Sequence, residues 1–186
     1  QFNMVAAAVA QLARHYNVPS AISAVSGTCC QSHQLMHQYS STIQTLVMAG
    51  ATEVSVLGHL SNAMQCSPTL AVICDEIMAM GNHFIQDIEM NGDALAVEAI
   101  RRAGPRGNFL SDKHTMEHLR QETRFNPAIF DWVDYNNWER GGKVNLLQRA
   151  EAKRQKILAE HEVPPLETAV EKEIAAILSA SDKALG

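Results

Sequence analysis

The alternation of helical segments with short apolar runs is the feature that most constrains how this chain can fold. Its first half follows the order helix, strand, helix, strand, helix, over residues 4–16, 20–25, 32–48, 53–57 and 68–90. The first apolar run is bounded by Pro19 and Gly27, and Gly58 ends the second. This order is typical of right-handed parallel βα units, so the sequence predicts an α/β fold with parallel strands. A doubly wound sheet and a barrel both satisfy the pattern.

The second half of the chain is predicted to be mainly helical. A helix at 93–103 is followed by a Gly-Pro turn, and residues 108–110 are the candidate for one last short strand. From Ser111 onward the pattern is helical, with breaks at Asn126-Pro127 and Gly141-Gly142. The whole chain should therefore contain more helix than strand.

Composition excludes several classes of protein. The chain has 186 residues, 46% of them hydrophobic, which is enough for one sizeable core. Fifteen Lys and Arg oppose 20 Asp and Glu without a basic run, so we expect no nucleic-acid partner. The apolar runs are shorter than the roughly 20 residues of a membrane helix, so we expect no membrane association. The four cysteines lack a disulfide framework spacing, which favours the cytoplasm.

One local motif suggests zinc chemistry. His114-Thr-Met-Glu-His118 matches the H-x-x-E-H pattern, in which two histidines bind zinc and the glutamate activates water. A zinc-dependent hydrolase is therefore an alternative function. It needs a third ligand, for which the candidates are Glu122, Glu139 and Glu151. Nothing in the sequence selects one of them, and we expect ordinary surface or helix-capping histidines that share no metal.

Polar residues follow both predicted strands, at the end where barrel enzymes place their active groups. Cys29 and Cys30 come after the first strand, and His59 and Asn62 come after the second. Buried cysteines and a hydrogen-bonded core histidine are the structural alternatives. An aromatic set could form a cage for a quaternary ammonium, although core or interface positions are the more common use of such residues: Phe125, Phe130, Trp132, Tyr135 and Trp138.

A combination of motifs resembles a known family. The most specific string is Gly104-Pro-x-Gly-x-Phe-Leu110 followed by His114-Thr115. The other matching segments are Thr28, Ala49-Gly-Ala51, Gly58-His-Leu60, Leu70 to Glu76, His118-x-Arg120, Tyr135-x-x-Trp138 and Pro164-Pro-Leu166. Together they resemble the carboxy-terminal end of the trimethylamine methyltransferase family, over nearly the whole chain.

The resemblance implies a fold and an organisation. Members of this family are much longer and form a complete barrel, so the chain is expected to be the carboxy-terminal βα units of a TIM-type barrel with a helical tail. Residues 1–125 would be the partial βα-barrel region and residues 126–186 the tail. A partial barrel leaves strand edges unpaired, so we expect a homo-oligomer and no activity of the chain alone.

The resemblance also implies an activity. Family members demethylate trimethylamine, glycine betaine or related amines, and pass the methyl group to cob(I)alamin held by a separate corrinoid protein. Archaeal members carry pyrrolysine at the end of a strand that resembles residues 20–27, where this chain has ordinary residues, so a quaternary amine is the expected substrate. No cofactor is expected to bind the chain directly. The expected substrate-binding residues are Thr28, His59, Asn62, Phe109 and His114, with no metal ligand.

The chain departs from the family pattern near the first strand. Family members usually carry an acidic residue soon after the threonine and another in the following helix, where this chain has Cys29, Cys30 and His37. A non-enzymatic binding or assembly module is therefore a further alternative, and it agrees with the incomplete barrel.

Overall fold

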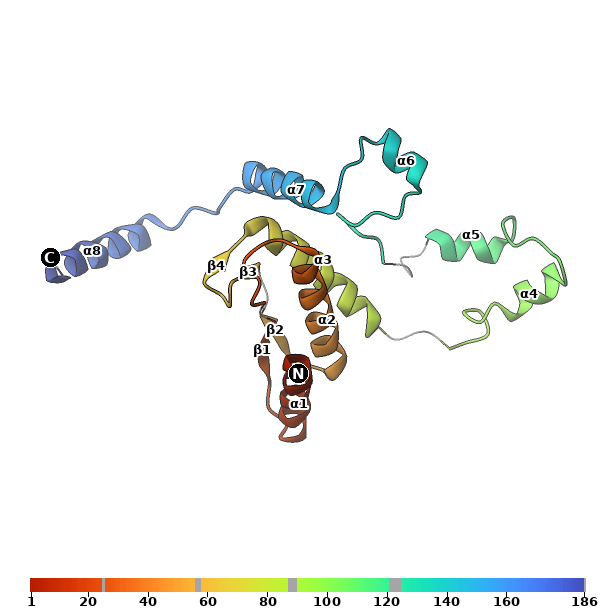
Figure 1. Ribbon diagram of the computed structural model, residues 1–186, viewed down its shortest axis with the longest axis horizontal. Coiled ribbons are helices and arrows are strands. Elements are labelled where there is room, and N and C mark those ends of the chain that lie inside the picture. Colours follow the sequence, from red (N-terminus) through yellow and green to blue (C-terminus); the bar gives the residue numbers. More distant parts are fainter. Residues whose placement is uncertain (25, 56–57, 87–89, 121–124, 186) are drawn as a thin grey trace. The chain divides into compact units, whose positions relative to one another are not determined.

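The computed structural model describes residues 1–24, 26–55, 58–86, 90–120 and 125–185, which form two compact units, 1–154 and 155–186. Within the described residues the chain is mixed α/β with more helix than strand (Figure 1). The helices are α1 Phe2–His15, α2 His33–Ala49, α3 Pro68–Phe84, α4 Val97–Ala103, α5 Lys113–Arg120, α6 Tyr135–Arg140, α7 Leu146–Glu160 and α8 Thr168–Leu185.

A parallel strand pair lies at the centre of the βα units. Strand β1, Ala21–Ser23, pairs with β2, Glu53–Ser55, with Ile22 opposite Val54. Ser20 and Thr52 extend the pairing, because each side-chain oxygen accepts a hydrogen bond from the other residue's backbone N–H, at 3.1 and 3.2 Å. The prediction of parallel strands is confirmed. The predicted strand ends at residues 25 and 56–57 lie outside the described residues.

A second strand pair was not predicted from the sequence. Strand β3, His59–Leu60, pairs antiparallel with β4, Gln65–Cys66, through a turn with positive φ at three residues that are not glycine: Ser61, Asn62 and Ala63. The strand predicted at 108–110 is wrong. There the Asn108 side chain accepts a hydrogen bond from the Leu110 N–H, so these residues form a turn.

Local signals fix the ends of the two central helices. The Ser32 side chain accepts a hydrogen bond from the Leu35 N–H at the start of α2, and Gly50 ends that helix in the left-handed conformation at φ 78°. The Ala51 N–H then donates to the Leu46 carbonyl, which completes a Schellman-type end. At the start of α3, Ser67 caps the helix and Pro68 occupies its first turn.

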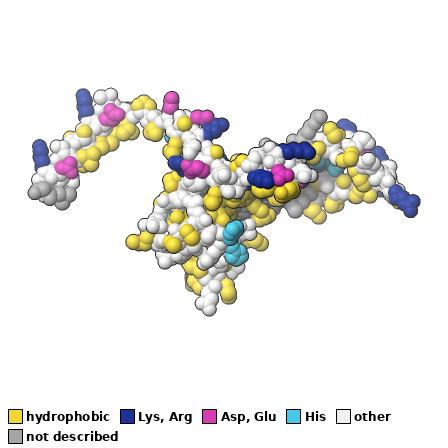
Figure 2. Space-filling view, turned by 45° about the horizontal axis from the view of Figure 1, so that its top comes forward, with side chains coloured by type: hydrophobic (Ala, Val, Ile, Leu, Met, Phe, Trp, Pro, Cys, Tyr) yellow, Lys and Arg dark blue, Asp and Glu magenta, His cyan; other side chains and the backbone are white. Residues whose placement is uncertain are grey.

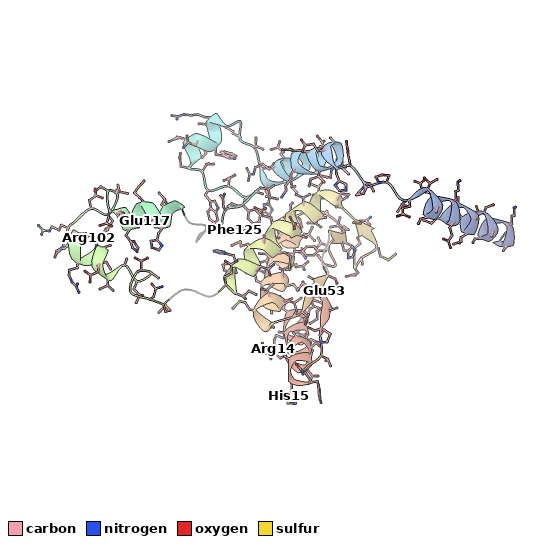
Figure 3. The ribbon with its side chains drawn as sticks, turned by 180° about the vertical axis from the view of Figure 1, so that it is seen from behind. Arg14, His15, Glu53, Arg102, Glu117 and Phe125 are labelled. Carbon is pink, nitrogen blue, oxygen red and sulfur yellow. The ribbon has the colours of Figure 1, made fainter. Side chains whose placement is uncertain are left out.

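The core of the first unit lies between α2 and α3. Its fully buried side chains include Leu35, Tyr39, Ile43, Leu70 and Ile73. Burial of an aliphatic side chain of this size contributes about 1.5–3 kcal/mol, so this contact is the main source of stability. Gly81 of α3 faces Val47 of α2, where an added Cβ would make an ordinary van der Waals contact with Val47 Cγ2 at 3.4 Å. Helix α1 adds Ala6 and Ala10, and Arg14 near its end donates to the Ala49 carbonyl of α2 (Figure 3).

A buried carboxylate joins α3 to the segment before α6. Asp75 is exposed and Glu76 is buried, as expected for adjacent helical positions that point about 100° apart. The Glu76 carboxylate accepts hydrogen bonds from the backbone N–H groups of Ala128 and Ile129, at 2.5 and 3.1 Å. Ile129 and Ala150 belong to the same hydrophobic cluster as α2 and α3. Part of the predicted tail therefore packs on the core of the first unit.

The second unit contains the amphipathic helix α8. Its exposed apolar residues follow helical spacing, at Val170, Ile174, Ile177 and Leu178. Figure 2 shows hydrophobic side chains along one side of this helix and charged side chains on the other. Of the helices in the described parts of the chain, none is long and apolar enough to cross a lipid bilayer.

Candidate functional site

A group of uncharged polar side chains follows β1. We call this group, Ser26, Thr28, Gln38 and Asn62, the strand-end cluster. The Ser26 and Thr28 hydroxyl oxygens lie 2.9 Å apart, and the Thr28 hydroxyl donates to the Gln38 Oε1 at 3.1 Å. Ser26 is buried and Thr28 is half-buried. The cluster therefore presents hydroxyl and amide groups at the carboxyl end of a parallel strand, where barrel enzymes carry their active groups.

The β3–β4 turn adds Asn62 to this cluster. The Ser61 N–H donates to the Thr28 carbonyl and the Asn62 N–H donates to the Ser26 carbonyl, both at 2.9 Å. The Asn62 side chain lies beside Gly27, where an added Cβ would be 3.4 Å from its Oδ1. The structure thus brings the predicted residues Thr28 and Asn62 together, although they are far apart in the sequence.

His59 lies near this end of the fold and is held through its backbone. The Tyr39 hydroxyl donates to the His59 carbonyl, and the His59 side chain is half-buried. Burial raises the pKa of Tyr39 to about 12, so its hydroxyl keeps its proton at neutral pH and remains a donor. Sequence reasoning missed Ser26 and Gln38. Ser26 carried a signal because it follows the strand two residues before Thr28, whereas Gln38 is one of several polar residues on α2.

The cysteines divide into exposed and buried residues. Cys29 and Cys30 are exposed beside the strand-end cluster, and Cys74 is buried in α3. Burial raises the pKa of the Cys74 thiol to about 11, so it stays protonated and unreactive at neutral pH. The structural alternative of buried neighbouring cysteines is therefore wrong for Cys29 and Cys30.

The other two predicted substrate-binding residues lie in the segment 91–120. Phe109 is partly exposed, and its carbonyl accepts from the Asp112 N–H. The His114 Nε2 lies 2.7 Å from the Asp93 carbonyl oxygen. Both contacts are with other residues of the segment 91–120. The part of Phe109 and His114 in substrate binding stays a prediction.

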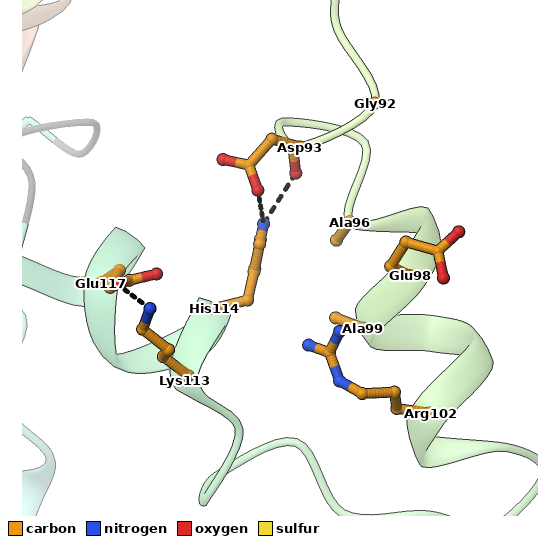
Figure 4. A pocket seen from close by; sticks show the side chains of 9 residues that line it. All are labelled: Gly92, Asp93, Ala96, Glu98, Ala99, Arg102, Lys113, His114 and Glu117. Atoms are coloured by element: carbon orange, nitrogen blue, oxygen red, sulfur yellow. Dashed lines mark hydrogen bonds and ion pairs between the residues drawn. The ribbon is translucent and has the colours of Figure 1, made fainter.

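A pocket of about 260 Å³ lies between α4 and the start of α5 (Figure 4). Its charged lining residues include Arg102 and Glu117, which Figure 3 shows on the two helices. Arg102 binds both carboxylate oxygens of Asp112. This hydrogen bonding holds the pKa of Asp112 below its usual value and raises that of Arg102. The pocket is therefore lined by cations that already have carboxylate partners.

The glutamate of the H-x-x-E-H motif does not occupy the position of a catalytic base. Its carboxylate pairs with Lys113 at 3.3 Å, and Figure 4 shows this pair beside His114, whose ring points to Asp93. Two of the predicted third ligands also have other partners, since Glu139 pairs with Lys143 and Glu151 with Arg154. Glu122 lies outside the described residues. The acidic residue beside the histidines is instead Asp93, which the sequence did not single out.

The aromatic residues do not gather into one cage. Phe125 lies near His83 with ring centroids 6.0 Å apart, and Phe130 packs against the hydrophobic cluster. Tyr135 and Trp138 contact each other at 5.8 Å, and the Trp138 N–H donates to the Val144 carbonyl. Phe130 therefore has the expected core position, whereas Trp132 and Tyr135 are 69% and 64% exposed and do not lie in the core.

Comparisons with known proteins agree with the resemblance seen in the sequence. A sequence profile of the trimethylamine methyltransferase family matches residues 1–186. A trimethylamine methyltransferase of Methanosarcina mazei is 30% identical over 185 residues, which are 99% of this chain and 37% of the relative. A glycine betaine methyltransferase of Desulfitobacterium hafniense is 29% identical over 185 residues, with 96% of this chain and 37% of the relative covered. The chain thus spans little more than a third of the length of these relatives.

Proposed function

Because the chain belongs to the trimethylamine methyltransferase family, we propose that it is part of an enzyme that removes a methyl group from a tertiary or quaternary amine. The match of the family over all 186 residues is the observation that carries this proposal. Relatives that act on trimethylamine and on glycine betaine both cover nearly the whole chain. We take a glycine betaine-like amine as the substrate. Archaeal members carry pyrrolysine at the end of a strand that resembles residues 20–27, and this chain has ordinary residues there.

The proposal includes a barrel of which this chain supplies the carboxy-terminal units. The parallel pair β1–β2, with α2 in the connection between the strands, is the repeating unit of a TIM-type barrel. The chain contains one such pair among its described residues and corresponds to 37% of its relatives' length. A longer parent protein would supply the remaining strands and most of the substrate pocket.

The strand-end cluster has the chemistry that this reaction needs. The methyl acceptor would be cob(I)alamin on a separate corrinoid protein, and it supplies a strong nucleophile. When the substrate is a quaternary amine such as glycine betaine, the departing amine is neutral, so the protein need not protonate it, and the four side chains of the cluster include no titratable group. Their hydroxyl and amide groups would hold the carboxylate of the amine by hydrogen bonds and orient its methyl group toward the acceptor.

The test compares the 186-residue chain with the longer parent protein. Each is mixed with glycine betaine and cob(I)alamin, and conversion to methylcobalamin is followed by absorbance. We expect turnover by the parent and none by the chain alone. Robust turnover by the chain would refute its dependence on a longer protein, and an inactive parent across a panel of quaternary amines would refute the proposed activity.

Variants of the parent test the strand-end cluster. Thr28→Val and Asn62→Ala remove hydrogen-bonding groups and should raise the KM for glycine betaine, each by about tenfold. Cys29→Ser changes the exposed neighbour of Thr28 and serves as the matched control, with an unchanged KM. Equal effects of all three variants would show that the cluster does not bind the amine.

The zinc-hydrolase alternative has no support from the position of Glu117, which pairs with Lys113.

A further inference from the structure

Three side chains from two places in the sequence bring potential ligand atoms close together. The His118 Nε2 lies 3.2 Å from the Asp93 Oδ2, and the His114 Nε2 lies 3.8 Å from the Asp93 Oδ1. The His114 Nε2 also lies 2.7 Å from the Asp93 backbone carbonyl oxygen, a hydrogen bond that a bound ion would replace. One ligand atom of each residue lies within 4.8 Å of the other two. Asp93 precedes His114 by 21 residues, so the fold of the segment creates this group.

The helix α5 gives the two histidines a common orientation. Residues four positions apart lie on the same face of a helix, and the rings of His114 and His118 have centroids 4.1 Å apart. The two side chains are 18% and 29% exposed, whereas Asp93 is 77% exposed. An ion could therefore reach the group from solvent through the carboxylate while the imidazoles stay largely covered.

The distances match a small divalent ion. Zinc binds imidazole nitrogen and carboxylate oxygen at about 2.0–2.2 Å, so ligand atoms around a tetrahedral ion lie roughly 3.3–3.5 Å apart. The two nitrogen-to-oxygen separations lie close to that range, although each is to a different oxygen of Asp93. One ligand atom of each residue lies within 4.8 Å of the other two, so side-chain rotations would draw the three atoms closer together around a bound ion. Two imidazoles and one carboxylate favour a transition metal over magnesium or calcium, which prefer oxygen ligands.

The cationic side chains near Asp93 are paired with other carboxylates, so the two histidines are its charged or polar neighbours. Lys113 pairs with Glu117, and Arg102 pairs with Asp112. We propose that Asp93, His114 and His118 bind one zinc-like divalent cation, which joins the turn after Asn91 to α5. The site differs from that of the hydrolase alternative, because Glu117 takes no part in it. It is also independent of the proposed methyl transfer.

The test is a zinc titration of the metal-stripped 186-residue chain. Exposed thiols also bind zinc, so the background protein carries Cys29→Ser, Cys30→Ser and Cys66→Ser. Calorimetry should show one zinc per chain, with a dissociation constant in the micromolar range or below. Asp93→Asn, His114→Ala and His118→Ala should each weaken binding about tenfold or more.

Two control variants are matched to the site. His33 and His37 have the same spacing on α2 and are both exposed, so their joint replacement by alanine should leave zinc binding unchanged. Glu117→Gln should also leave it unchanged. Circular dichroism checks that each variant keeps its helix content, and Asp93→Asn tests an exposed residue with little effect on packing. Failure of the background protein to bind zinc, or equal binding by Asp93→Asn, would overturn the proposal and leave an Asp–His hydrogen-bonded group without metal.

Discussion

Replacement of Glu76 tests how strongly one buried carboxylate holds the segment around Ile129. Glu76→Leu removes the acceptor of two backbone N–H groups, in a site where Glu76 is 3% and Ile129 is 2% exposed. A buried N–H left without a partner costs about 1–3 kcal/mol. Ala128 is exposed, so its N–H can bind water, whereas Ile129 is buried; the variant should therefore lower the free energy of unfolding by about 1–3 kcal/mol. Arg149 donates to the Ile129 carbonyl and restrains the segment from moving out to water.

The comparison variants separate hydrogen bonding from general damage to α3. Glu76→Gln keeps a side-chain oxygen acceptor and should cost only about 1 kcal/mol, because the hydrogen bonds lose their charge. Asp75→Asn alters the exposed neighbour and should change stability by less than about 0.5 kcal/mol. Urea unfolding followed by circular dichroism measures all three variants. The reasoning is wrong if Glu76→Leu is no more destabilising than Asp75→Asn.

Further predictions concern backbone conformation and buried ionisable groups. Gly58→Ala should lower the free energy of unfolding by more than about 1 kcal/mol, because φ is +75° and the new Cβ would overlap the Ser67 carbonyl. The new Cβ of Gly92→Ala would meet no atom within 4 Å, so this variant should leave the free energy of unfolding unchanged. Thermal melts compare the two variants. Mass spectrometry after brief alkylation at neutral pH should find Cys29 modified and Cys74 protected. Folding raises the pKa of Cys74 from 9.0 to about 11 and of Tyr39 from 10.0 to about 12. The stability that these groups give below about pH 9 should therefore be lost as pH rises toward 12, in urea titrations at each pH.

Local signals in the sequence were sufficient for the central helices and strands. Ser32, Gly50 and Pro68 act on backbone groups within a few residues, so they place both ends of α2 and the start of α3 almost where the structure has them. The predicted end of the third helix at residue 90 is wrong, because α3 ends at Phe84. The parallel pairing followed from the order of elements, because short strands separated by a helix pair in parallel. For the candidate site, the residues Thr28 and Asn62, chosen because they follow predicted strands, lie near each other, and their binding of a substrate stays a prediction.

Contacts between distant residues were beyond the reach of those signals. Ser61 and Asn62 adopt positive φ without being glycine, so the β3–β4 turn had no clear mark in the sequence. The acidic residues predicted as a third ligand to the H-x-x-E-H histidines all follow the motif, whereas Asp93 precedes it. Gln38 joins the strand-end cluster only because the fold brings α2 to the residues that follow β1, and helical periodicity alone does not identify that partner.

The hydrogen bonds of Glu76 also have a consequence for the topology of the chain. They join residues 52 positions apart, and the intervening stretch, which includes α4 and α5, is thereby a closed loop. The entropic cost of closing a flexible loop rises slowly, by about 0.6 kcal/mol for each doubling of its length. Insertions between α4 and α5 should therefore be tolerated without loss of the α2–α3 core. The same stretch could be exchanged between relatives as a unit, provided that the acceptor on α3 and the two amides that it binds are retained.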